Sequence, residues 1–86
     1  MSGSEKQFEF DKPFLKEFYE NLKLKVSSSN IRITNIKHPD WHEIYEFQKN
    51  GFVATYKFYY NKKGIFSKVE NIPPTTGLIN EINELL

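Results

Sequence analysis

The chain has 86 residues, which is the size of a single domain. It contains no cysteine, which excludes disulfide bonds, thiolate metal sites and cysteine catalysis and favours a reducing compartment. The formal net charge of +1 points to no class of partner, and no apolar run approaches the roughly 20 residues of a membrane span. The polar start of the sequence lacks the apolar core of a signal peptide. We therefore expect a cytoplasmic protein without membrane contact.

Charge is distributed unevenly along the chain. Between Asn21 and Pro39, and again between Phe47 and Val69, every charged side chain is basic. The acidic side chains gather elsewhere, so one interpretation is a fold with one basic and one acidic side. The alternative is an ordinary mixed surface. The basic residues of these stretches are Lys23, Lys25, Arg32 and Lys37, followed by Lys49, Lys57, Lys62, Lys63 and Lys68.

The first predicted element is a helix over residues 12–25. Residues 1–10 are expected to be a flexible segment, and residues 11–86 a single α+β domain. Asp11 is a suitable N-cap, and Pro13 in the first turn loses no hydrogen bond. The predicted apolar stripe consists of Phe14, Phe18 and Leu22, widened by Leu15 and Tyr19.

A strand is predicted over residues 31–37. The alternation of apolar residues fails at Ile36, so we expect a bulge near Asn35. Residues 38–41 contain a proline that suits the second position of a type I turn. A second strand, residues 41–48, follows this turn.

The dipeptide Asn50-Gly51 is the clearest hairpin signal and predicts a type I′ turn. The strand after it, residues 52–60, is the richest in aromatic and β-branched residues. Pairing across the turn sets Lys49 opposite Phe52 and divides the hairpin into two faces. The predicted core face carries Trp41, Tyr45, Phe47, Phe52, Ala54, Tyr56, Phe58 and Tyr60. The predicted outer face carries His42, Ile44, Glu46, Val53, Thr55, Lys57 and Tyr59.

The register of the last strand, residues 65–70, is open. A four-residue loop would place Ile65 and Val69 on the core face. A type I turn with a glycine bulge at Gly64 would instead place Phe66 there. The choice moves every side chain of the strand to the opposite face.

The final element is a helix that begins after Thr75 or Thr76 and runs to the end of the sequence. The element order is therefore α-β-β-β-β-α, with hairpins between the strands. This order predicts an α+β fold, a two-layer sandwich in which two helices cover one face of a four-stranded antiparallel meander. The apolar stripe of the last helix consists of Leu78, Ile82 and Leu85, supported by Ile79 and Leu86.

The order of helix, antiparallel sheet and helix resembles that of double-stranded RNA-binding domains. Those domains have three strands, and lysines at the start of their last helix contact phosphates. Residues 73–77, Pro-Pro-Thr-Thr-Gly, stand at that place here and include no lysine. No residue role is carried over from that family.

The candidates for catalysis or metal binding are two histidines and the carboxylates near them. His38 and His42 flank a predicted turn, and both are interpreted as edge histidines that point outward. Glu43 and Glu46 face opposite sides of a strand, so they cannot act as an acid–base pair. Asp40 lies in the turn. We therefore expect no metal, no cofactor and no enzymatic activity.

Glu43 is the exception on the predicted core face. Its position in the alternation points a carboxylate toward apolar residues. Either it lies at the rim with Lys37 or Lys63 nearby, or the pairing of the strands differs from the prediction.

The sequence favours a small non-enzymatic binding or accessory domain that contacts nucleic acid through a lysine- and aromatic-bearing sheet face and a hairpin tip. Lysines neutralise phosphates, and exposed aromatic rings stack on bases. The alternative is a protein–protein interaction module such as an adaptor, an inhibitor or an immunity-type protein, using the same face or a strand edge. The predicted nucleic-acid-binding residues are Arg32, Lys49, Lys57, Tyr59, Lys62, Lys63 and Lys68.

Overall fold

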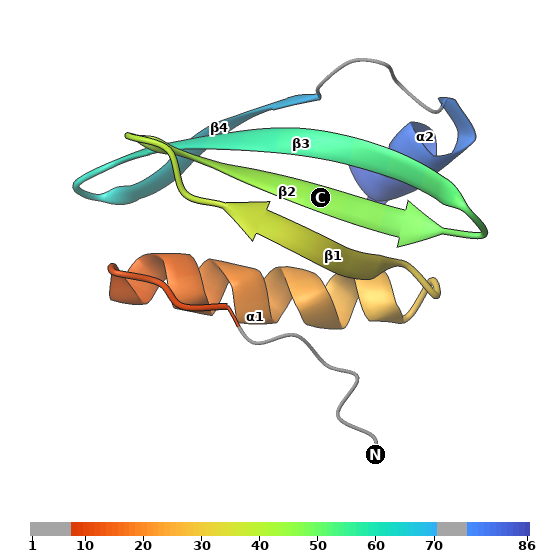
Figure 1. Ribbon diagram of the computed structural model, residues 1–86, viewed down its shortest axis with the longest axis horizontal. Coiled ribbons are helices and arrows are strands. Elements are labelled where there is room, and N and C mark those ends of the chain that lie inside the picture. Colours follow the sequence, from red (N-terminus) through yellow and green to blue (C-terminus); the bar gives the residue numbers. More distant parts are fainter. Residues whose placement is uncertain (1–7, 71–75) are drawn as a thin grey trace.

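The predicted element order and fold class are confirmed by a computed structural model, which describes residues 8–70 and 76–86 (Figure 1). The elements are α1 (Pro13–Ser27), β1 (Arg32–Lys37), β2 (His42–Lys49), β3 (Phe52–Asn61), β4 (Gly64–Glu70) and α2 (Thr76–Leu85). The strands form one antiparallel sheet in the order β1-β2-β3-β4. In Figure 1, α1 runs beneath the strands. None of the described helices is long and apolar enough to cross a membrane.

The hairpin between β2 and β3 sets the register of the sheet. Asn50 and Gly51 have φ values of 52° and 83°, which are the positive values that a type I′ turn requires. Lys49 pairs with Phe52, as predicted, and the pairing continues without interruption along both strands. Because side chains alternate between faces, this register fixes which residues of β2 and β3 point toward the helices.

The core lies between the sheet and the helices and is rich in aromatic rings. Phe18 of α1 packs edge-on against Phe58 of β3, with the ring centroids 5.0 Å apart. On the α2 side, the Tyr56 hydroxyl donates to the Ile79 carbonyl at 3.2 Å. Both helices therefore pack on the same face of the sheet. Among the strand residues whose side chains the structure describes, the buried ones are Ile36, Glu43, Tyr45, Phe47, Ala54, Tyr56, Phe58 and Tyr60.

Two residues predicted for the core face are exposed. Trp41 is 53% exposed, because its φ of 62° places it in the left-handed turn before β2, where strand alternation does not yet apply. Phe52 is 58% exposed, because it lies at the very start of β3, next to the turn.

The details of α1 also differ from the prediction. Lys12, not Asp11, is the N-cap residue of α1, and the Lys12 side chain makes no capping hydrogen bond. The buried stripe is centred one residue later than predicted, so Phe14 and Phe18 lie half-buried at its margin. The buried residues of α1 are Leu15, Tyr19, Leu22 and Val26. Residues 1–7 and Thr75, which enter the predictions for the two ends of the chain, lie outside the described residues.

Both edge strands contain a bulge. In β1 the pairing shifts between Ile33 and Asn35, close to where the sequence predicts it. In β4 the pairing shifts at Phe66, because Ile65 pairs with Tyr60 whereas Ser67 pairs with Tyr59. The predicted alternatives for β4 are therefore each wrong in part. Ile65 pairs with a core residue, but beyond the bulge Lys68 pairs with Phe58 and Val69 pairs with Lys57.

The turn between β2 and β3 gives a direct test of how much its backbone conformation contributes to stability. Gly51→Ala should lower the free energy of unfolding by about 1–2 kcal/mol, because a side chain is strained at positive φ. Gly77→Ala in α2 is the matched control, since a Cβ there meets open space and alanine favours a helix. Urea unfolding of both variants measures the two changes. Equal changes of the same sign would contradict the turn assignment.

Candidate nucleic-acid interface

The candidate interface is the outer face, which is the side of the sheet that points away from α1 and α2. Along β3 it carries Val53, Thr55, Lys57 and Tyr59, which alternate with the buried residues of the core. None of these outer residues is buried. The face therefore offers a continuous surface that crosses the strands, as a sheet needs for contact with an extended partner.

Basic side chains lie on β1 and β3 of the outer face. Lys57 stands in the middle of β3 and pairs with Ile44 of β2. Arg32 stands on the edge strand β1, where its guanidinium donates to the Gln48 side chain at 3.4 Å. Lys37, which was not among the predicted nucleic-acid-binding residues, also lies on this face, because its pairing with Ile44 follows the β1 bulge. These cations are positioned to meet phosphates on a ligand laid over the sheet.

Aromatic rings gather around Tyr59 at one end of the outer face. The Tyr59 ring lies 5.4 Å from the His42 ring and 6.5 Å from the Phe66 ring. Phe66 is 61% exposed, because the bulge removes it from the ladder. The position of Phe66 could not be found from sequence, since it depends on that bulge. Exposed rings of this kind can stack on bases or enter a base step.

The tip of the β3–β4 hairpin carries two exposed lysines, Lys62 and Lys63. The Asn61 side chain accepts a hydrogen bond from the Lys63 backbone N–H at 2.8 Å and so holds the turn. The tip follows the strand that carries Lys57 and Tyr59. It therefore extends the basic character of the outer face past the end of the sheet.

Two predicted site residues lie on the other side of the sheet. Lys49 points toward the helices, where its Nζ lies 2.6 Å from Oε2 of Glu81 in α2. Lys68 lies on the helix side because the β4 bulge reverses its orientation, and its Nζ lies 3.4 Å from Oδ1 of Asn83. The structure therefore does not bring these two lysines together with the outer-face residues.

A shallow depression of about 230 Å³ lies on the outer face. Its lining combines a cation, a carboxylate and neutral polar groups. A surface of this kind can hydrogen-bond a polar ligand but encloses none. The lining residues are Asn35, Lys37, Ile44, Glu46 and Thr55.

A contact between the buried carboxyl group of Glu43 and the partly exposed imidazole of His38 lies at the end of the sheet, apart from the outer face. Glu43 is fully buried, and its Oε1 lies 2.6 Å from Nδ1 of His38. Burial raises the pKa of Glu43, and the charges of His38 and Lys12 oppose that rise. The predicted strand pairing is correct here, but the partner of Glu43 is neither Lys37 nor Lys63.

His38 therefore does not point away from the protein as predicted. It contacts Glu43, and the Phe10 ring packs edge-on against its imidazole at 5.2 Å. Sequence alone gave no signal for this pair, because it depends on how the 38–41 turn folds back. Within residues 8–70 and 76–86, no three histidine, aspartate or glutamate side chains are grouped to hold a metal ion.

Comparison with known proteins gives one family. A family model described as the TATA-binding-like protein domain of the TOTE conflict systems matches residues 12–86. The match covers all the described helices and strands. Neither the curated proteins nor the solved structures compared with the chain include a significant match.

The buried carboxylate of Glu43 should make stability depend on pH. Because its pKa is raised in the folded state, the folded protein binds more protons than the unfolded chain between pH 4.5 and that raised value. The contribution of Glu43 is therefore most favourable at low pH and declines as the pH rises. Urea unfolding from pH 4 to pH 8 should show this decline for the unmodified protein relative to Glu43→Gln.

Glu46→Gln is the matched control, since it removes a carboxylate from the outer face. The difference in the free energy of unfolding between the unmodified protein and this variant should change less with pH. If the free energies of unfolding of the unmodified protein and of Glu43→Gln changed in parallel with pH, this would contradict the raised pKa of Glu43.

Proposed function

The chain belongs to the family of TATA-binding-like domains of the TOTE conflict systems, and we propose from this that it is a non-enzymatic accessory domain that binds nucleic acid. The outer face and the β3–β4 tip form the binding surface. The observation that supports this most is the outer face itself. Both helices pack on the opposite side, which leaves Lys57, Tyr59 and Phe66 accessible on one surface.

The physical basis of binding is phosphate neutralisation combined with ring contacts. Arg32, Lys37 and Lys57 each supply a cation on the outer face, and Lys62 and Lys63 supply two more at the tip. Each phosphate contact releases counterions, so the affinity falls as salt rises. The rings add attraction that depends little on salt.

Duplex DNA is the form of nucleic acid that the arrangement favours. The family takes its description from TATA-binding protein, and proteins of that type lay a sheet in the minor groove and insert apolar side chains between base steps. Phe66 lies at the end of the outer face with most of its ring exposed. It is therefore the side chain best placed to act as such a wedge.

A protein partner on the outer face is the competing possibility, because Ile44 and Val53 add apolar area to it. The two possibilities differ in their dependence on salt. Binding to nucleic acid weakens steeply as salt rises, whereas binding through apolar contacts does not.

Reversing the charge at the centre of the outer face should weaken nucleic-acid binding. Lys57→Glu removes a phosphate contact and adds repulsion, so the affinity for a duplex oligonucleotide should fall roughly tenfold at low salt, with a shallower salt dependence. Lys16→Glu on the exposed side of α1 is the matched control and should leave binding unchanged. Fluorescence anisotropy at two salt concentrations measures both. An equal loss of duplex affinity in the two variants would contradict the assignment, because the effect would then come from the net charge of the protein and not from the outer face.

Removing the exposed ring should weaken binding in a different way. Phe66→Ala should lower the duplex affinity by about 1–3 kcal/mol while the salt dependence stays the same, because a ring contact involves no counterion. Leu24→Ala removes an exposed apolar side chain from α1 and serves as the control. The same anisotropy titrations report the result. An unchanged affinity for Phe66→Ala would exclude the wedge role.

A further inference from the structure

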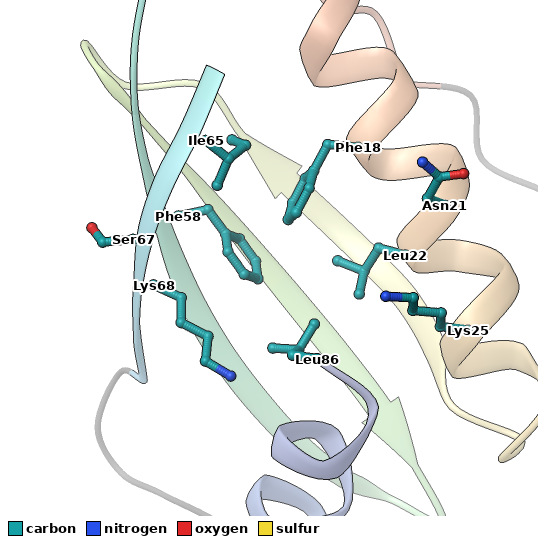
Figure 2. A pocket seen from close by; sticks show the side chains of 9 residues that line it. All are labelled: Phe18, Asn21, Leu22, Lys25, Phe58, Ile65, Ser67, Lys68 and Leu86. Atoms are coloured by element: carbon teal, nitrogen blue, oxygen red, sulfur yellow. The ribbon is translucent and has the colours of Figure 1, made fainter. Parts of the chain in front are cut away.

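A groove lies on the helix side of the sheet, between α1, β4 and the end of the chain at Leu86 (Figure 2). Its volume is about 350 Å³. Phe58 and Leu22 are buried in its floor, while Leu86 is 38% exposed. The groove thus keeps apolar surface in contact with water at one edge of the sheet. The apolar lining residues are Phe18, Leu22, Phe58, Ile65 and Leu86.

Two lysines border this apolar floor from opposite sides. Figure 2 shows Lys25 reaching over the floor from α1 and Lys68 from β4. Among the side chains that the structure describes, none that lines the groove is acidic. Within the described part of the chain neither lysine forms an ion pair, and Nζ of Lys68 donates a hydrogen bond to the neutral side-chain amide of Asn83. Two cations beside an apolar floor, without a counterion, complement an occupant that is both apolar and acidic.

The β4 bulge is what brings Lys68 to this groove. Without the shift at Phe66, strict alternation from Ile65 would turn Lys68 to the outer face. Bulges are known to redirect side chains at binding sites. The same irregularity therefore exposes Phe66 on the outer face and turns a cation toward the groove.

The occupant that fits best is an extended segment of a partner protein. β4 is an edge strand of the sheet, so its outer backbone groups offer a template for a further strand. The groove volume lies near the lower limit of pockets that enclose a drug-sized ligand. It therefore accommodates one or two large side chains of a longer chain better than a whole small molecule.

We propose that the groove between α1 and β4 docks an extended, acidic segment of a partner protein. One large apolar side chain of that segment occupies the floor, and carboxylates beside it pair with Lys25 and Lys68. This site is separate from the outer face and does not depend on the proposed binding of nucleic acid. The domain then has two surfaces, one on each side of the sheet.

The probe is a synthetic hexapeptide with leucine and phenylalanine in the middle and two acidic residues on each side. Its titration into the isotope-labelled chain is followed by heteronuclear NMR. Shifts should concentrate on Leu22, Lys25, Ile65, Lys68 and Leu86. A second peptide, with lysines in place of the acidic residues, should give none of these shifts.

Exchanging the charges of the groove and of the peptide distinguishes a loss of binding from a loss of folding. The double variant Lys25→Glu with Lys68→Glu should bind the acidic peptide at least tenfold more weakly and should gain binding of the lysine peptide. A variant that failed to fold would gain nothing. Lys57→Glu is the control on the outer face, and its affinity for the acidic peptide should stay unchanged. Its loss of duplex binding would be a separate result about the outer face.

Three outcomes would overturn the proposal. The first is the absence of shifts at the groove with millimolar acidic peptide. The second is saturation of the groove by hexanoate with higher affinity than by the peptide, which would make it a small-molecule site. The third is a concentration-dependent dimer in sedimentation that the double variant abolishes, which would make the occupant a second copy of the chain.

Discussion

The type I′ turn at Asn50-Gly51 is the constraint on which the rest of the structure depends. It fixes the register of β2 against β3, and a shift of one residue would exchange the two faces of both strands. With the observed register, Tyr45, Tyr56 and Phe58 are buried on the side of the helices. Lys57 and Tyr59 lie on the opposite, outer face. The division of the sheet into a face packed on the helices and an outer face therefore follows from the conformation of two residues.

Those parts of the fold that follow from regular alternation could be predicted from the sequence. The element order, the β2–β3 pairing and the outer positions of Lys57 and Tyr59 all rest on a two-residue period and one strong turn signal. Arg32 was placed correctly for the same reason, since it pairs with Gln48 ahead of the β1 bulge.

Most of what was not predicted depends on irregular backbone or on contacts between distant residues. The side of the sheet on which Lys68 lies stayed open, because it depends on the bulge at Phe66, which the sequence does not reveal. Trp41 was predicted for the core face but is exposed, because it precedes β2 and has a left-handed backbone conformation. Lys49 was assigned to the outer face, although its position in the alternation already pointed it toward the helices. The partners of Lys49 and Glu43 lie on α2 and in the turn before β2, and no local pattern signals such pairs.

The pairing of charges explains how one small sheet can keep two basic surfaces distinct. Lys49 lies on the helix side, but Glu81 neutralises it, so it adds little to the field there. Lys25 and Lys68 form no such ion pair among the described residues, so their charges are not neutralised there. The outer-face cations are separated from them by the sheet and its aromatic core. The nucleic acid proposed for the outer face and the partner segment proposed for the groove use different side chains, so the two proposals are compatible with simultaneous binding.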